Sequence, residues 1–136
     1  MSKHETPMIQ WFWDREGGTL IEEYEICKKE FTYARRLIDA IILPTGQRVR
    51  LEGKGRNEIN LEQQDVVVVQ AKAYRLGMYL MGQALFSAEL VKALKPRSIR
   101  TVALCKYDDS MLRPLAEKYG IEVVITPNPL PKHLHQ

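Results

Sequence analysis

Two polar side chains end the valine-rich segment 65–72, in which Gln70 and Lys72 follow an apolar run. Residues two apart along a strand lie on the same face, so we expect these two side chains next to each other. A second apolar segment, 36–43, carries Asp39 at its centre, where a lone carboxylate is costly to bury without a partner or a metal ion. An acid, an amide and a lysine on neighbouring strands predict a metal site that hydrolyses phosphodiester bonds.

Each of these residues has a role that phosphodiester hydrolysis requires. Asp39 is the anionic metal ligand, and Gln70 offers its amide oxygen. Ala71 adds its carbonyl oxygen if the end of the strand is open. Lys72 positions the attacking water or stabilises the charge that develops on phosphorus. Oxygen ligands of this kind are the ones that Mg²⁺ or Mn²⁺ prefers.

Other charged residues near these segments have two interpretations each. One carboxylate of the pair Glu22 and Glu23 completes the metal site, or both lie on a solvated strand edge. Several basic or aromatic residues either contact phosphates or are ordinary surface residues. These are Arg35, Arg36, Arg48, Arg50, Lys54, Arg56, Tyr74 and Arg75.

The residues Ile38-Asp39 and Gln70-Ala71-Lys72 resemble the signature of the PD-(D/E)XK nuclease superfamily, an acid on one strand followed by acid-x-lysine on the next. Gln70 replaces the usual acid and is similar to the QxK variant of the Mrr-like restriction endonuclease branch, although the glycine-rich lead-in of that branch is absent. Gln83 resembles the helix glutamine that follows the lysine strand in many exonuclease-type relatives. Together with a carboxylate of the Glu22/Glu23 pair, these residues give the expected catalytic set, which is Asp39, Gln70, Lys72, Glu23 and Gln83.

The likeness extends over much of the chain. Segments 18–23, 35–40, 70–72 and 86–90 resemble a small stand-alone bacterial family without an assigned role. For the fold, the resemblance implies a restriction-endonuclease-like core from about residue 22 to residue 126. Such a core is a mixed sheet flanked by helices, with its catalytic groups on the second and third strands.

The pattern of apolar residues independently predicts which elements position these side chains. It indicates strands over 19–27, 36–43, 66–73, 99–107 and 121–126, and helices over 76–94 and 109–119. Alternation of strands and helices predicts an α/β fold with a central mixed β-sheet. Segment 7–16, with Trp11 to Trp13, is either a short helix or an irregular lead-in, and segment 47–51 is a candidate edge strand.

Segment 76–94 has enough large apolar residues to predict a largely buried helix. We expect one stripe of leucines to face the core, with Gln83 on that stripe, and further residues to widen it. The leucines are Leu76, Leu80, Leu90 and Leu94, and the widening residues are Met78, Met81, Leu85 and Phe86. At the next helix, Asp108 or Asp109 is the expected N-terminal cap and Gly120 the expected end.

Length and composition limit the kind of protein this is. The 136 residues suit one domain over 1–126, followed by a disordered tail over 127–136 that contains three prolines and two histidines. Cys27 and Cys105 form no metal-binding or disulfide motif, which favours a reducing cytoplasm. No apolar run approaches the ~18 residues of a membrane span, so we expect a soluble protein. A net charge of +3 permits a nucleic-acid partner without requiring one.

Three functions follow, in order of support. The first is a Mg²⁺- or Mn²⁺-dependent deoxyribonuclease. The second is a catalytically degenerate module that binds nucleic acid or a protein partner through the same basic loops. The third, a small-ligand α/β domain, lacks a glycine-rich phosphate loop. The small size leaves little room for a separate recognition domain, so we expect a homodimer.

Overall fold

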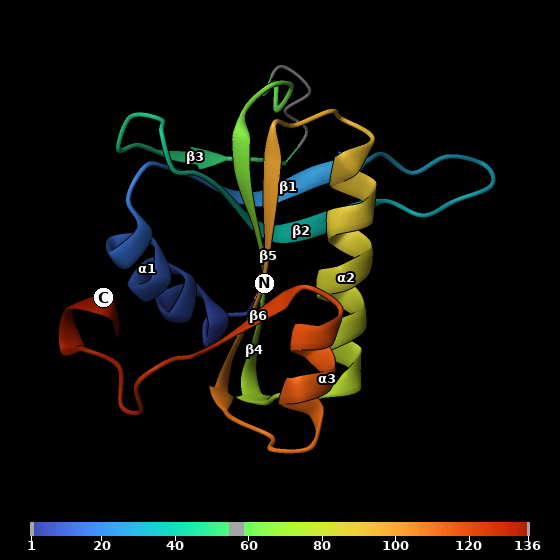
Figure 1. Cartoon of the computed structure of the whole chain (residues 1–136). Coiled ribbons are helices and arrows are strands. Elements are labelled where there is room, and N and C mark those ends of the chain that lie inside the picture. The colour runs from blue at the N-terminus through green and yellow to red at the C-terminus, as the bar shows by residue number, and fades with distance from the viewer. Residues whose placement is uncertain (1, 55–58, 136) are drawn as a thin grey trace.

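The structure, a computed structural model, describes residues 2–54 and 59–135. Within these ranges the chain forms a six-stranded sheet with helices on both faces (Figure 1). The elements in chain order are α1 (Glu5–Glu16), β1 (Thr19–Cys27), β2 (Arg36–Leu43), β3 (Arg50–Glu52), β4 (Asp65–Arg75), α2 (Met78–Lys92), β5 (Ser98–Tyr107), α3 (Leu112–Lys118), β6 (Ile121–Ile125) and the 3-10 helix η1 (Lys132–His135).

The sheet is mixed, and its order is β3-β1-β2-β4-β5-β6. Strand β2 lies between β1 and β4 and is antiparallel to both, whereas β4, β5 and β6 are parallel. The short strand β3 pairs with β1 in parallel at the sheet edge. The expected α/β fold with a central mixed sheet and flanking helices is therefore confirmed.

Segment 7–16, for which the sequence left two interpretations, is part of the helix α1. Its buried residues are Met8, Ile9, Phe12 and Trp13, which lie on one helical stripe against the sheet. The Trp13 indole N–H donates to the Gly18 carbonyl at 2.8 Å and so ties the end of the helix to the start of β1. Most of the aromatic cluster therefore belongs to the core.

Strand β4 lies in the middle of the sheet and is buried on both faces, as a continuous valine run predicts. Val67 and Val69 pack toward α1, together with Val102 of β5. Val66 and Val68 belong to the cluster that includes Val91 of α2. Helices α2 and α3 thus cover one face of the sheet and α1 covers the other (Figure 1).

The expectation about the buried face of α2 was wrong in part. The buried residues within the helix are Leu80, Ala84, Ala88 and Val91. Met78, Phe86, Leu90 and Leu94 are exposed. Alanines on the inner face let the helix lie close to the sheet, which turns the larger apolar side chains outward.

The residues around α3 act largely as the sequence predicts. Asp109 accepts the backbone N–H of Leu112 through Oδ1 at 2.9 Å, and so caps the first turn. Gly120 follows the helix with a φ of +79°, a conformation that glycine adopts without strain. These two residues fix both ends of a seven-residue helix.

The C-terminal segment is not the disordered tail that the sequence suggested. Residues 132–135 form η1, and Leu130 is only 8% exposed because it packs into the core beside α1. A single leucine among prolines was too weak a pattern to predict this contact.

The cysteines are unpaired, as expected. Cys105 is buried, and its burial raises the pKa of the thiol to about 11, which makes it a poor nucleophile. Among the residues that the structure describes, no helix is long and apolar enough to cross a membrane.

Gly18 is a point where the fold depends on the absence of a side chain. Its φ is +78°, and a Cβ there would lie 2.2 Å from the Leu43 carbonyl oxygen. The adjacent Gly17, with a φ of +73°, has nothing within 4 Å of a Cβ. Gly17→Ala is therefore expected to cost roughly 1–3 kcal/mol of unfolding free energy from backbone strain alone.

Gly18→Ala should cost that amount plus roughly 1–3 kcal/mol for the overlap. Urea denaturation of wild type and both variants measures the difference. Equal losses in the two variants would show that the contact between Gly18 and β2 is unimportant.

Candidate active site

Strands β2 and β4 separate in the region where the sequence placed the candidate catalytic residues. Their paired register covers only Ala40↔Val69, Ile41↔Val68 and Ile42↔Val67. Beyond the first of these pairs both strands continue, β2 back to Arg36 and β4 on to Arg75. The backbone groups of β4 on this side therefore need partners other than β2.

Asp39 and Gln70 bond to each other's strand at this opening. The Asp39 backbone N–H donates to Gln70 Oε1 at 3.3 Å, and the Ala71 backbone N–H donates to Asp39 Oδ2 at 2.9 Å. In a strand, the N–H and C=O of one residue point to the same side, so the Ala71 carbonyl also faces the opening. The expected meeting of Asp39 with Gln70 and Ala71 is present in the structure.

A second acid at this opening, Glu5, is one that the sequence pattern did not indicate. Its Oε2 accepts the backbone N–H of Ala73 at 3.2 Å, two residues beyond the Ala71 N–H that Asp39 accepts. Glu5 lies in the first turn of α1, which packs on the face of the sheet opposite α2. The available signal was one acid at the start of a helix rich in apolar residues, but the sequence does not show where that helix packs.

The acids at the opening influence one another's charge. Burial raises the pKa of Asp39; the hydrogen bond from Ala71 opposes this rise, and the charges of Glu5 and Glu23 add to it. Burial also acts to raise the pKa of Glu5, but hydrogen bonds from Ser2 and Ala73 and the charge of Lys72 outweigh it, so the pKa is lowered. Asp39 is thus the carboxylate whose negative charge is least well compensated.

Glu23, and not Glu22, shares the electrostatic environment of Asp39. Glu23 has a φ of +52° and lies across from Asp39 in the register of β1 and β2. Its carboxylate forms an ion pair with Lys54 at 2.6 Å. Glu22 instead forms an ion pair with Arg50, which also contacts Gln10 of α1.

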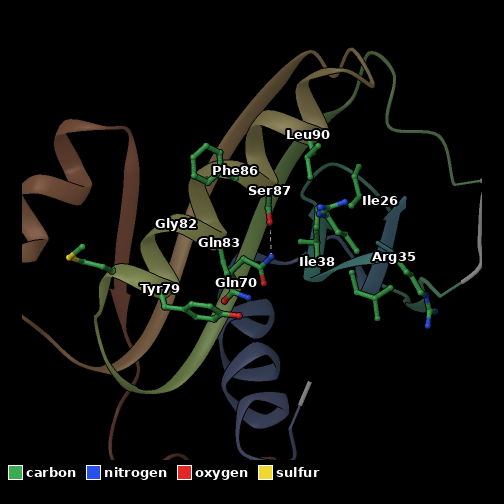
Figure 2. Close-up of a pocket in the computed structure, with 13 residues that line it drawn as sticks. Ile26, Arg35, Ile38, Gln70, Tyr79, Gly82, Gln83, Phe86, Ser87 and Leu90 are labelled. Carbon is green, nitrogen blue, oxygen red and sulfur yellow. Dashed lines mark hydrogen bonds between the residues drawn. The ribbon is translucent and has the colours of Figure 1, made fainter. Parts of the chain in front are cut away.

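The Gln70 side chain also contacts α2, one of the helices that cover the sheet. This side chain is 3% exposed, and Nε2 donates to the Ser87 hydroxyl of α2 at 2.7 Å. Figure 2 shows this bond at the side of a groove of about 630 Å³. Tyr79, Gln83 and Ser87 of α2 all line the groove next to Gln70. Gln83 thus shares a groove with Gln70, although we expected it to face a pocket that Asp39 and Lys72 also line.

Lys72 and Asp39 are not among the residues that line this groove. Lys72 is exposed near the end of β4, and its charge lowers the pKa of Glu5. The candidate residues thus form two adjoining groups. One group, with Asp39, lies where β2 and β4 separate, and the other, with Gln83, lines the groove. Gln70 belongs to both, because its amide oxygen faces Asp39 and its amide nitrogen faces α2.

The candidate phosphate-binding residues are dispersed. Arg35 and Arg36 line the groove, whereas Arg48 forms an ion pair with Asp14 at 2.6 Å near the β3 edge of the sheet. Arg75 donates to the Asp108 carbonyl at 2.7 Å, and Tyr74 beside it is exposed at the end of β4. Arg56 lies outside the described residues.

The donors at the opening suit a hard divalent cation in type, since they are carboxylate, amide and carbonyl oxygens. The imperfectly compensated charge of Asp39 also fits a cation. However, among residues 2–54 and 59–135, no three Asp, Glu, His or Cys side chains gather closely enough to hold a metal ion. A cation would therefore bind through Asp39 together with neutral oxygens, such as those of Ala71 and Gln70.

No model of a protein family matches this chain, and no curated protein or solved structure matches it either.

The raised pKa of Asp39 has a testable effect on stability. A carboxyl whose pKa is higher in the folded state destabilises the protein as pH rises from its ordinary value of 3.8 through the raised pKa. Asp39→Asn keeps an oxygen for the Ala71 N–H and removes this titration. We expect the melting temperature of the variant, relative to wild type, to increase between pH 3.8 and neutral pH.

Asp65 is the matched control because its pKa is shifted in the opposite direction. Its hydrogen bonds to Arg97 and Ser98 lower the pKa to about 2, so its stabilising effect is present above pH 3.8 and is lost as pH falls toward 2. Asp65→Asn should therefore melt below wild type at neutral pH. If both variants shift in the same direction, the electrostatic contrast between the two acids is wrong.

Proposed function

We propose that the chain is a metal-dependent nuclease that hydrolyses phosphodiester bonds in DNA, with a restriction-endonuclease-like core. The observation that carries this proposal is the bonding of Asp39 to Gln70 and Ala71 where β2 and β4 separate. The order of strands also supports it. Asp39 lies on the second strand of an antiparallel β1-β2-β4 unit, and Gln70-Ala71-Lys72 lies on the third.

In this proposal, Asp39 and the Ala71 carbonyl hold Mg²⁺ or Mn²⁺, with Glu23 supporting them by its negative charge. When bound, the metal supplies Lewis-acid activation of water and of the phosphoryl group. Lys72 places its ammonium group beside the scissile phosphate, where it stabilises the charge that develops in the transition state. Glu5 lies within electrostatic reach of that lysine, whose charge lowers the pKa of the Glu5 carboxyl.

A second function is favoured by the bonding of Gln70. Both ends of its amide already bond within the protein, to the Asp39 N–H and to the Ser87 hydroxyl. A residue so engaged can serve purely to join β4 to α2. The alternative is therefore a degenerate nuclease-fold module that binds nucleic acid or a protein partner without cutting.

Gln70→Glu tests whether position 70 contacts the metal. The added charge should raise the pKa of Asp39 further, lower the melting temperature in EDTA and tighten Mn²⁺ binding. The Ser87 hydroxyl can donate to the new carboxylate, so the link to α2 is kept. Calorimetric titration of Mg²⁺ and Mn²⁺ into both proteins measures the change. Equal affinities would place residue 70 outside the metal's ligands.

Lys72→Ala separates the two functions. We expect cleavage to fall by about 10²–10³-fold while most of the affinity for nucleic acid is retained, because the charge acts chiefly in the transition state. Lys118→Ala, which removes an exposed lysine on α3, is the control and should cut normally. The assay uses supercoiled, linear and single-stranded DNA and RNA, each with Mg²⁺, Mn²⁺ or EDTA. If the wild-type protein binds these substrates but cuts none of them, the remaining function is the degenerate module that binds without cutting.

A further inference from the structure

The groove beside Gln70 has one wall with exposed aromatic side chains and one wall with basic side chains. One wall is α2, with Tyr79 and Phe86 exposed at 75% and 66%. The other is the start of β2, with Arg35 and Arg36. Between them lie the amides of Gln70 and Gln83 and the Ser87 hydroxyl (Figure 2). Aromatic rings, cations and amide groups recognise bases and phosphates together.

The shape of the groove follows from Gly82. A Cβ at this position would have nothing within 4 Å, so the missing side chain leaves an indentation in the wall that α2 forms. Figure 2 shows Gly82 between Tyr79 and Phe86, with the Tyr79 ring turned toward Gln83 and Gln70. Residues 79 and 86 are two turns apart on one side of the helix, so their backbones are about 10 Å apart. That spacing leaves room for a flat ring at Gly82.

The positive charge at the groove is only partly compensated, since Arg35 forms an ion pair with Glu25 at 3.1 Å. Arg36 donates to the Ala34 carbonyl at 3.1 Å and contacts the Cys27 sulfur, which leaves other guanidinium donors for a ligand. Among the described residues, no ion pair involves Arg36, Lys28 or Lys29. By contrast, Arg48 and Arg50 each pair with a carboxylate. Arg36 in the groove and the nearby Lys28 and Lys29 are therefore cations available to a ligand.

The connection between β1 and β2, residues 28–35, extends this surface. It projects past α2 as a long arm (Figure 1). Its Phe31 side chain is fully exposed and Tyr33 is also exposed, and Lys28 and Lys29 flank them. The arm thus repeats the combination of aromatic and basic side chains that the groove wall has.

We propose that this groove and arm bind a single-stranded segment of nucleic acid and lead it past Gln70 to Lys72. The inference rests on the proposed nuclease function and narrows its substrate to unpaired strands. In a duplex the bases are stacked inside and only the backbone and groove edges are offered, so the apolar groove wall would gain little contact. An unpaired strand offers base faces to Tyr79 and Phe86 and phosphates to Arg36.

Binding is tested in EDTA, so that the result does not depend on cleavage. Fluorescence anisotropy with an oligonucleotide, as a single strand and as a duplex, should show about tenfold or greater preference for the single strand. Tyr79→Ala and Phe86→Ala should each weaken single-strand binding by about tenfold. Tyr119→Ala, which removes an exposed ring just after α3, should leave binding unchanged.

Gly82→Leu adds a large side chain at a position where a Cβ has nothing within 4 Å, and should reduce single-strand binding as strongly as Tyr79→Ala, whereas Gly82→Ala should have little effect. Circular dichroism checks that both variants are folded. Equal affinity for single strand and duplex overturns the inference, even if the protein cuts DNA. If the protein prefers single strands but cleaves none of the substrates, the result supports single-strand binding in the groove and overturns the nuclease function. If Gly82→Leu changes only the oligomeric state, the groove is an interface between copies and the inference fails.

Discussion

The separation of β2 from β4 after the pair Ala40↔Val69 is the constraint on which the candidate site depends. A strand that loses its neighbour leaves N–H groups that must find other acceptors. Here carboxylates take that place, with Asp39 accepting from Ala71 and Glu5 from Ala73. The same hydrogen bonds that complete the strand edge therefore concentrate negative charge at one point. The same two carboxylates therefore satisfy the backbone of β4 and supply the negative charge of the candidate site.

The amide at position 70 connects this edge to the helical layer. Its oxygen accepts from Asp39 and its nitrogen donates to Ser87. A carboxylate is only an acceptor, so it would need the Ser87 hydroxyl to donate and would add charge beside an acid whose pKa is already raised. Gln70 thus keeps the link between β4 and α2 without that electrostatic cost. An amide at position 70 therefore has a physical explanation, whichever function the site performs.

The packing of α2 has an equally direct consequence for the surface. Ala84 and Ala88 face the sheet, so the helix lies close to it and buries little of its own volume. Tyr79 and Phe86 are left on the outside, where they border the groove. A helix with apolar residues on all sides normally has each side covered. The exposed side of α2, with its two aromatic rings, departs from that pattern.

The sequence by itself determined most of the elements and placed the principal candidate residues along them. Valine runs and alternation predict β2, β4 and β5, and the positions of Asp39, Gln70 and Lys72 along them follow, because strand periodicity is a local property. Only the tertiary structure decided that Glu5 lies at the candidate site and that, of the pair Glu22 and Glu23, it is Glu23 that influences Asp39. It also decided which side of α2 is buried. These outcomes depend on where α1 docks, on a backbone bend at Glu23 and on how closely α2 approaches the sheet, none of which a local pattern contains.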